Sequence, residues 1–312
     1  MAPPVRSGLA VLCCGDRGPL TCMRGDDVPD DTWLLLDAFE DLNPALKPIR
    51  VGWCSEGARD MDASVVLPLG CWDYLDRIDE FRSCIQVLAD SGVQPEADLR
   101  ALLWASHKSY LLDLEAAGLP VVPTVVVCAG SCAEDITLAC GELGRKCARA
   151  AIVGDETELL YKPALGTRGQ GVVRLRLSAG CAAGAEDLLG LVATTDMLIQ
   201  PWLPHVSVGG ELCFVFVNEE LLHVVHKSAA HWSKDKTTAA PPRTDVCSGA
   251  PSLGHPVQRL SAEDCAPQLT LARRALALVR QLGCSGSSLD SCLYLCRIDL
   301  LPNGTLGWLV SE

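Results

Sequence analysis

Residues 161–173, YKPALGTRGQGVV, place Lys162 at the end of an apolar run and then three glycines within six positions. Strands expected at 157–163 and 172–177 flank the glycines, so the stretch predicts a β-hairpin with a glycine-rich tip. Glycine permits close backbone approach, and several N–H groups at such a tip can point at one phosphate beside the lysine. A phosphate cradle with a largely solvent-accessible Lys162 is one interpretation, and an ordinary surface turn is the other.

The composition predicts a globular protein of about two domains. The chain has 312 residues, 49% of them hydrophobic and 21% charged, with no apolar run that reaches membrane-spanning length. We therefore expect a cytoplasmic protein without a membrane partner. The net charge of −13 argues against a nucleic-acid partner. The 17 cysteines include no C-x-x-C pair, which argues against a zinc ribbon or a thioredoxin-like redox site.

Strands alternate with helices in the first 95 residues. Strands are expected at 8–15, 49–53 and 63–70, and helices at 30–42 and 77–92. This alternation predicts an α/β unit with a small parallel sheet covered on both faces.

A lysine also lies near an expected helix start. Ser106 can cap a helix that runs to Ala117 and is ended by Gly118, which places Lys108 in the first turn. That position is unfavourable for a cation because the helix dipole is positive there. A solvated surface lysine and an anion held between the lysine and the helix start both remain open.

Two hairpins are expected in the C-terminal third, at 210–229 and 293–312. Asp299 interrupts the apolar strand of the second hairpin, and Glu312 closes its partner strand. A buried carboxylate is costly unless it is paired or bound to a metal ion. Carboxylates on adjacent strands are a suitable platform for hydrated Mg²⁺ that also binds substrate phosphates.

The order of these parts resembles the ATP-grasp superfamily, in particular the branch related to glutathione synthetase and to the ligases that add glutamate to ribosomal protein tails. Six strings carry the resemblance, in order along nearly the whole chain: CWDYLDRIDEF (71–81), SHKSYLLDLEAAGLPVVPT (106–124), YKPALGTRGQG (161–171), LIQPWLP (198–204), HVVHK (223–227) and RIDLLPNG (297–304). The implied fold is an α/β ATP-grasp fold. It has a pre-ATP-grasp domain (1–95), a central lobe with a lid hairpin (96–203) and a C-terminal lobe with the metal site (204–312).

The resemblance also implies a role for individual residues. The ATP phosphates would be contacted by Lys108 and Lys162 and covered by lid residues Gly166, Thr167, Gly169 and Gly171. Adenine would be read by the backbone of the hinge, Gln200, Pro201, Trp202 and Leu203. Mg²⁺, with Mn²⁺ as an alternative, would be held by Asp299 and Glu312, and Lys227 would face the transferring phosphoryl group or the acyl phosphate.

The implied activity is an ATP- and Mg²⁺-dependent ligase that joins a small-molecule carboxylate to an amine through an acyl phosphate, with homo-oligomerisation left open. The alternative is an ATP-binding pseudoenzyme or an inactive fragment. The family has a further metal-ligating oxygen two residues beyond this Glu, whereas this sequence stops at Glu312, so we expect a truncated chain or an impaired site. Leu69 stands where the family commonly has Arg, which weakens any inference about the acyl substrate.

Overall fold

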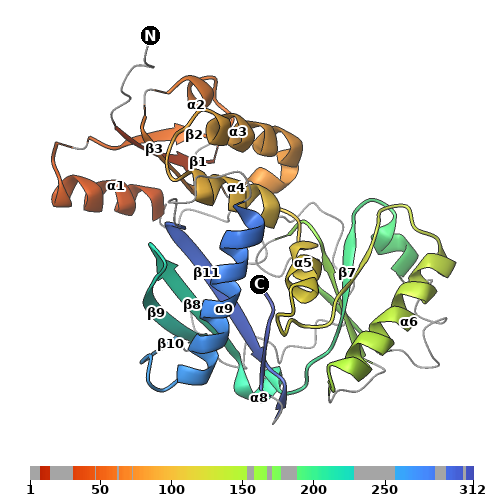
Figure 1. Ribbon diagram of the computed structural model, residues 1–312. Helices are drawn as coiled ribbons and strands as arrows, with labels where there is room; N and C mark the ends of the chain where they lie inside the picture. Colours follow the sequence, from red (N-terminus) through yellow and green to blue (C-terminus); the bar gives the residue numbers. More distant parts are fainter. Residues whose placement is uncertain are drawn as a thin grey trace. The chain divides into compact units, whose positions relative to one another are not determined.

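The computed structural model describes residues 8–14, 31–45, 47–61, 63–71, 73–152, 158–166, 171–176, 188–227, 257–284, 293–304 and 307–312 (Figure 1). The chain divides into two units. The described residues of unit 1 lie within Met1–Trp104 and Gly283–Tyr294, and those of unit 2 within Ala105–Pro241, Pro251–Leu282 and Leu295–Glu312. Among the helices described, none has the length and apolar character needed to cross a bilayer. The three-domain division stays a prediction.

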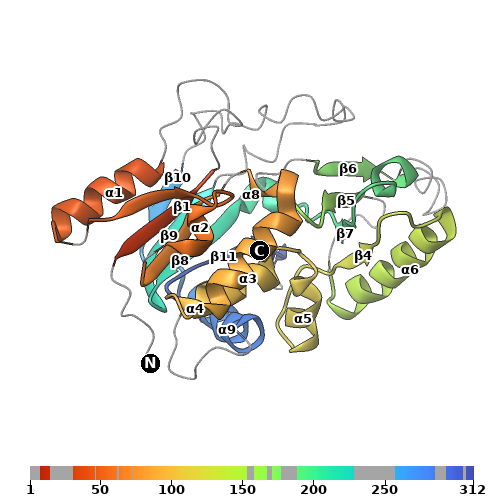
Figure 2. The same cartoon turned by 90° about the horizontal axis from the view of Figure 1, so that it is seen from above.

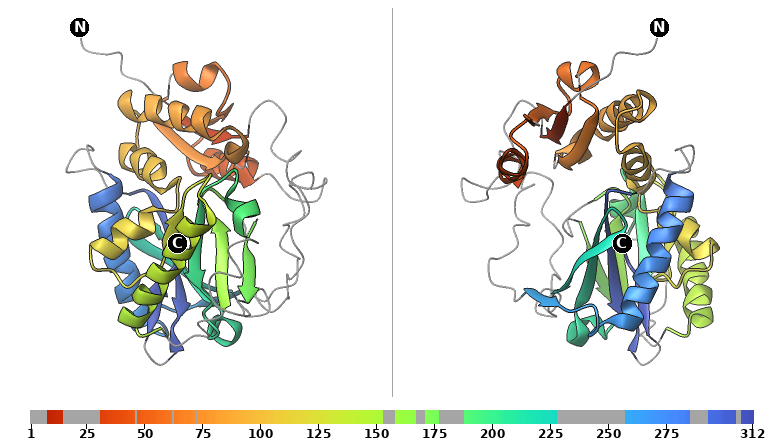
Figure 3. Two further views of the ribbon diagram at one scale, coloured as in Figure 1. Left: turned by 90° about the vertical axis from the view of Figure 1, so that its right-hand side faces the viewer. Right: turned by 60° about the vertical axis from the view of Figure 1, so that its left-hand side comes forward.

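Unit 1 contains the expected parallel sheet, in the order β2-β1-β3. The strands are β1 (Leu9–Cys13), β2 (Ile49–Gly52) and β3 (Val65–Gly70). The helices are α1 (Asp31–Leu42), α2 (Gly57–Asp60), the 3₁₀ helix η1 (Tyr74–Arg77), α3 (Ile78–Asp90) and α4 (Glu96–Ala105). Every residue of β1 is buried, as a central strand covered on both faces should be. Figure 3 shows α1 and α3 on opposite faces of this sheet.

The first sheet of unit 2 is antiparallel, in the order β4-β7-β5-β6. Its strands are β4 (Val125–Val127), β5 (Glu158–Pro163), β6 (Val173–Arg176) and β7 (Met197–Pro201). The long helix α6 (Ala133–Arg149) covers one face and buries Ile136 and Leu143 against the sheet (Figure 2). The β5–β6 pairing confirms the predicted glycine hairpin, while its tip, 167–170, lies outside the described residues.

The second sheet of unit 2 has the order β10-β9-β8-β11-β12, and each pair of neighbouring strands in this order is antiparallel. Its strands are β8 (Glu211–Val217), β9 (Glu220–Lys227), β10 (Val257–Leu260), β11 (Leu295–Pro302) and β12 (Trp308–Val310). The short helix α8 (Val206–Gly209) precedes β8, and α9 (Ala266–Gly283) lies along the sheet. Both predicted C-terminal hairpins are therefore present.

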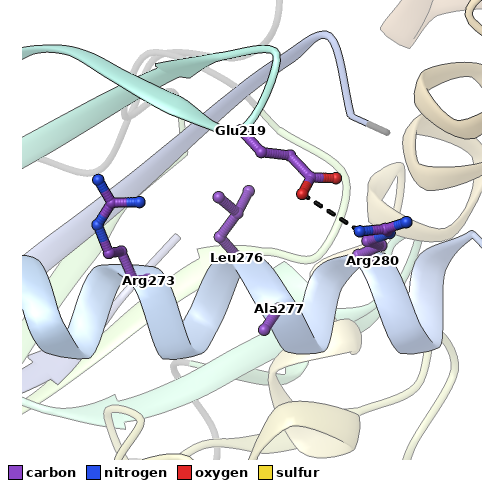
Figure 4. A pocket seen from close by; sticks show the side chains of 5 residues that line it. All are labelled: Glu219, Arg273, Leu276, Ala277 and Arg280. Atoms are coloured by element: carbon purple, nitrogen blue, oxygen red, sulfur yellow. Dashed lines mark hydrogen bonds and ion pairs between the residues drawn. The ribbon is translucent and has the colours of Figure 1, made fainter. Parts of the chain in front are cut away.

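The turn between β8 and β9 has the backbone that a tight hairpin requires. Asn218 and Glu219 have φ of 52° and 63°, in the left-handed region that two-residue hairpin loops use. Arg280 of α9 contacts Glu219 at 3.3 Å and helps to fix this turn (Figure 4). The same figure shows a small hollow between the turn and α9, lined by Glu219, Arg273, Leu276, Ala277 and Arg280.

The helix expected from Ser106 begins later than predicted. Helix α5 spans Tyr110–Ala116, and Lys108 lies in the turn before it rather than in its first turn. The backbone N–H of Lys108 donates to the Ala164 carbonyl at 2.9 Å, just beyond β5. This long-range hydrogen bond places Lys108 by tertiary contact, which no local capping pattern reveals. The C-terminal end is as predicted, with Gly118 at φ +82°.

Candidate functional site

Three segments distant in the sequence bring two lysines to one carboxylate in unit 2. Lys108 comes from the turn before α5, Lys162 from β5, and Glu312 follows β12. The ammonium nitrogens of Lys108 and Lys162 lie 3.5 and 3.9 Å from the same oxygen, Oε1 of Glu312. Lys108 also donates to the carbonyl of Gly166 at 2.7 Å. The structure thus brings together both lysines predicted to bind phosphate and one residue predicted to bind metal.

Lys162 is buried, which corrects the expectation of a largely solvent-accessible side chain. Only 8% of the residue is exposed, because its strand lies inside the sheet between β6 and β7. Burial lowers the pKa of Lys162, and repulsion from Lys108 lowers it further, while attraction to Glu312 opposes both. The charged form of Lys162 is therefore incompletely compensated, and an incoming anion would stabilise it.

Asp299 is almost fully buried on β11 and is held by a bidentate ion pair. Arg297 donates to both carboxylate oxygens, at 2.9 and 2.8 Å. Burial alone would lower the pKa of Arg297, but the charge of Asp299 outweighs it and raises that pKa. This pairing is the arrangement that makes a buried carboxylate tolerable.

The β11–β12 ladder places Glu312 beside Asp299. The Asp299 N–H donates to the Glu312 carbonyl at 2.8 Å, and the Ser311 N–H donates to the Asp299 carbonyl at 2.9 Å. One guanidinium nitrogen of Arg297 lies 2.8 Å from Asp299 and 4.0 Å from Glu312. Both carboxylates predicted to bind metal can therefore be reached from one position.

Glu211, at the start of β8, is a site residue that the sequence analysis missed. It is 7% exposed, and its Oε1 accepts a hydrogen bond from Lys227 at 3.1 Å. Lys227 also lies 3.9 Å from Asp299. Burial and the charge of Asp299 raise the pKa of Glu211 to about 7, with Lys227 opposing the shift. The signal was present, because an acid opens an otherwise apolar strand, ELCFVFV, much as Asp299 interrupts its own.

The pairing of Glu211 with Lys227 depends on the glycine before it. Gly210 has φ +67°, and a Cβ there would lie 2.2 Å from the carbonyl oxygen of Lys227. Glu211 pairs directly with Lys227 in the β8–β9 register. Only glycine allows the two strands to approach this closely at that point.

The predicted hinge is ordered around β7 and largely buried. The Gln200 side chain donates to Thr124 Oγ1 at 2.8 Å, and the Trp202 N–H donates to the Glu158 carbonyl at 3.0 Å. The guanidinium of Arg174 lies 4.0 Å from the centre of the Trp202 ring, in cation–π geometry. Leu203 is buried in a small apolar cluster with Val122, Val206 and Leu309. Adenine recognition by the predicted set Gln200, Pro201, Trp202 and Leu203 stays a prediction.

The base of the predicted lid is described, and its tip is not. Gly166 binds Lys108 through its carbonyl. Gly171 has φ +68°, and a Cβ there would lie 2.8 Å from Cγ of Pro163, so the return into β6 requires glycine. Thr167 and Gly169 lie outside the described residues, and their role stays a prediction.

The donor set suits a divalent ion that arrives with a polyanion. Carboxylate oxygens are the ligands that Mg²⁺ prefers, and Asp299 and Glu312 supply them side by side. In their ionised forms the cluster has four cations and three carboxylates: Lys108, Lys162, Lys227 and Arg297 against Glu211, Asp299 and Glu312. This slight excess of positive charge favours a phosphate-bearing ligand over a bare cation.

Comparisons with known proteins agree with this architecture. No protein-family model matches the sequence. A curated relative, the cycloserine biosynthesis protein DcsG of Streptomyces lavendulae, is 31% identical over 126 residues, which are 40% of this chain and 39% of the relative. The matched stretch thus spans about two fifths of that relative's length.

Solved structures resemble nearly the whole chain. The crystal structure of D-cycloserine synthetase DcsG matches with a TM-score of 0.69 and 24% identity, covering 98% of this chain and 90% of that one. A RimK-domain ATP-grasp protein from Sphaerobacter thermophilus matches at 0.54 and 17%, covering 98% and 90%. D-alanine–D-alanine ligase from Bacillus anthracis, in complex with ATP, matches at 0.54 and 11%, covering 98% and 85%. The chain has the ATP-grasp fold, as predicted.

Proposed function

From the ATP-grasp fold and the charge cluster of unit 2, we propose that the protein is an ATP- and Mg²⁺-dependent ligase that joins a carboxylate to an amine through an acyl phosphate. One observation carries the proposal: Lys108 and Lys162 meet at the Glu312 carboxylate, which lies beside Asp299. Cations for a polyphosphate and acids for its metal ion thus share one place. The relatives named for D-cycloserine synthesis and D-alanine–D-alanine ligation support the reaction class.

In this proposal the two lysines bind the ATP polyphosphate. Of the two lysines, Lys162 is stabilised more by a bound phosphate, because the anion compensates a positive charge that is costly in its buried position. The hinge binds adenine through the backbone of Leu203. Pro201 has no N–H, and the N–H of Trp202 is already used by Glu158, so the Leu203 N–H is the expected donor.

The chemistry proceeds in two steps. An oxygen of the substrate carboxylate attacks the γ-phosphorus as the bond to the ADP oxygen breaks, giving an acyl phosphate. The amine then attacks the acyl carbon, a C–N bond forms, phosphate leaves and the amine loses a proton. Lys227 and Arg297 lie beside Asp299 and would stabilise negative charge on the transferring group. Mg²⁺ or Mn²⁺ held by Asp299 and Glu312 would neutralise charge on the polyphosphate.

We place the reaction in the cytoplasm with small-molecule carboxylate and amine substrates. The alternative is an ATP-binding protein without turnover. The contacts of Asp299 favour this alternative, because both of its carboxylate oxygens accept hydrogen bonds from Arg297 and Lys227 lies nearby, which leaves them less available to a metal ion. In that case nucleotide binding would persist and no phosphoryl group would transfer.

Product analysis separates the two. The protein would be incubated with Mg-ATP, pooled amino acids as carboxylate donors, and hydroxylamine, which traps acyl phosphates as hydroxamates. If the protein is a ligase that forms an acyl phosphate, ADP and hydroxamate should form in equal amounts. Formation of AMP and pyrophosphate would contradict it, and Mg-ATP binding without either product would support the alternative.

A further inference from the structure

Glu312 is the shared counterion of Lys108 and Lys162, the two lysines proposed to bind phosphate. Its Oε1 lies 3.5 Å from Lys108 and 3.9 Å from Lys162, while its Oε2 faces Arg297 at 4.0 Å. The Glu312 side chain is 39% exposed, whereas those of Lys108 and Lys162 are 15% and 10% exposed. The carboxylate is therefore the solvent-facing member of a trio whose two cations lie deeper.

This arrangement makes one carboxylate serve two incompatible purposes. While Glu312 neutralises the lysines, their attraction for a polyphosphate is reduced, and the carboxylate itself repels the anion. A divalent ion bound beside Asp299 competes for the same oxygens. Glu312 cannot give its full charge to the ion and to the lysines at once, so drawing it to the ion restores the lysines' net charge of two.

We infer that Glu312 acts as a partner-exchanging gate that weakens the binding of metal-free ATP and couples the affinity of the site for nucleotide to the presence of the divalent ion. Without the ion, Glu312 occupies the lysines. With the ion, Glu312 turns to it, and Lys108 and Lys162 become available to the phosphates. Since such coupling is reciprocal, nucleotide also strengthens ion binding by the same factor. The inference rests on the proposed nucleotide site and adds a role for Glu312 beyond metal ligation.

The distinguishing prediction concerns metal-free conditions. A residue that only ligates metal has no effect on ATP binding when no metal is present. If Glu312 restrains the lysines, Glu312→Gln removes the restraint and should bind ATP in excess EDTA about tenfold more tightly than wild type, which corresponds to about 1.4 kcal/mol. The same variant should lose most of the gain in ATP affinity that Mg²⁺ gives the wild type.

Calorimetric titration of ATP into the full chain, with EDTA and then with Mg²⁺, measures both effects. Glu220→Gln is the matched control: it removes the same charge from an exposed position at the start of β9 and should leave both affinities unchanged. Glu312→Ala is a second variant with the same expected result, and thermal unfolding checks that each variant is folded.

The outcomes separate the gate from the nucleotide site itself. Tighter metal-free binding in Glu312→Gln, but not in Glu220→Gln, supports the gate. Unchanged or weaker metal-free binding in both Glu312 variants overturns it, provided that the wild type binds Mg-ATP. If the wild type binds no Mg-ATP, the proposed function is wrong, and the gate that rests on it is wrong as well. An equal gain in metal-free ATP affinity in Glu220→Gln would show that the effect comes from the net charge of the protein, which would also overturn the gate.

Discussion

Lys162→Met should stabilise the ligand-free protein and destroy its response to nucleotide. Lys162 attracts Glu312 across 3.9 Å, which is worth about 4 kcal/mol at an effective dielectric constant of about 20. Burial and repulsion from Lys108 oppose this attraction, and the lowered pKa of Lys162 shows that they outweigh it. Removing the lysine does not leave Glu312 uncompensated, since Lys108 and Arg297 remain beside it.

We therefore expect a gain in stability of about 1 kcal/mol, the lower end of what replacing a buried ion pair by apolar side chains gives. For a chain of 312 residues this gain raises the melting temperature by about 1.5 °C per kcal/mol. The free energy of Mg-ATP binding should weaken by about 1.5–3 kcal/mol, or about 10- to 150-fold in affinity, the value of one charge-assisted contact. Thermal unfolding with and without Mg-ATP, and calorimetric titration, measure the two effects.

The pH dependence gives a second readout. Because the pKa of Lys162 in the folded state lies below the ordinary 10.5, the unfolded chain holds more protons between the two values. This group therefore makes wild-type stability rise as pH increases towards about 10.5, and Lys162→Met should remove that contribution.

Lys146→Met is the matched control for Lys162→Met. Lys146 pairs with Glu115 and donates to the Thr124 carbonyl, so its loss should lower the melting temperature and leave ATP affinity intact. If Lys162→Met melts as low as Lys146→Met in EDTA and still gains the wild-type stabilisation from Mg-ATP, then Lys162 neither destabilises the protein without nucleotide nor binds the phosphates.

Three further substitutions test other parts of the site. Glu211→Gln should flatten the pH dependence of urea unfolding. The pKa of Glu211 is raised from 4.5 to about 7, so between these values the folded protein keeps a proton that the unfolded chain has lost. The stability of the wild type therefore falls as the pH rises through this range, and the variant should lack this contribution. An unchanged profile between pH 5 and 7.5 would contradict the assignment. Asp299→Asn should abolish ATP turnover. It should also lower the stability of the metal-free protein by about 1 kcal/mol, because the half-exposed Arg297 loses a bidentate partner. A higher melting temperature without metal would show that the ion pair does not stabilise the fold. Gly210→Ala should cost about 1–3 kcal/mol, since its Cβ would strike the Lys227 carbonyl at positive φ, and a wild-type melting temperature would refute that geometry.

The sequence was sufficient for features that repeat along a strand or helix. Short runs rich in apolar residues located the parallel strands of unit 1, and turn residues located the hairpins. Asp299 was identifiable because a charge in an apolar strand needs a partner. The resemblance placed Lys108, Lys162 and Glu312 in one site, and the structure brings them together.

Features set by long-range contact were not accessible in the same way. The position of Lys108 depends on a hydrogen bond from its backbone N–H to the carbonyl of Ala164, 56 positions away in the chain. The burial of Lys162 depends on strands that flank β5 from both sides. The acid that opens the apolar strand ELCFVFV marks Glu211 as unusual, but its pairing with Lys227 depends on the β8–β9 register, which no local pattern specifies.

A crystal structure of the full chain with Mg²⁺ and a non-hydrolysable ATP analogue would show directly where the polyphosphate and the metal ion bind. We expect phosphate oxygens within hydrogen-bond distance, about 3 Å, of the ammonium groups of Lys108 and Lys162. We also expect the metal ion on Asp299 and Glu312, with the Glu312 carboxylate turned away from the lysines. An analogue bound elsewhere, with the Glu312 ion pairs to both lysines intact, would contradict both expectations.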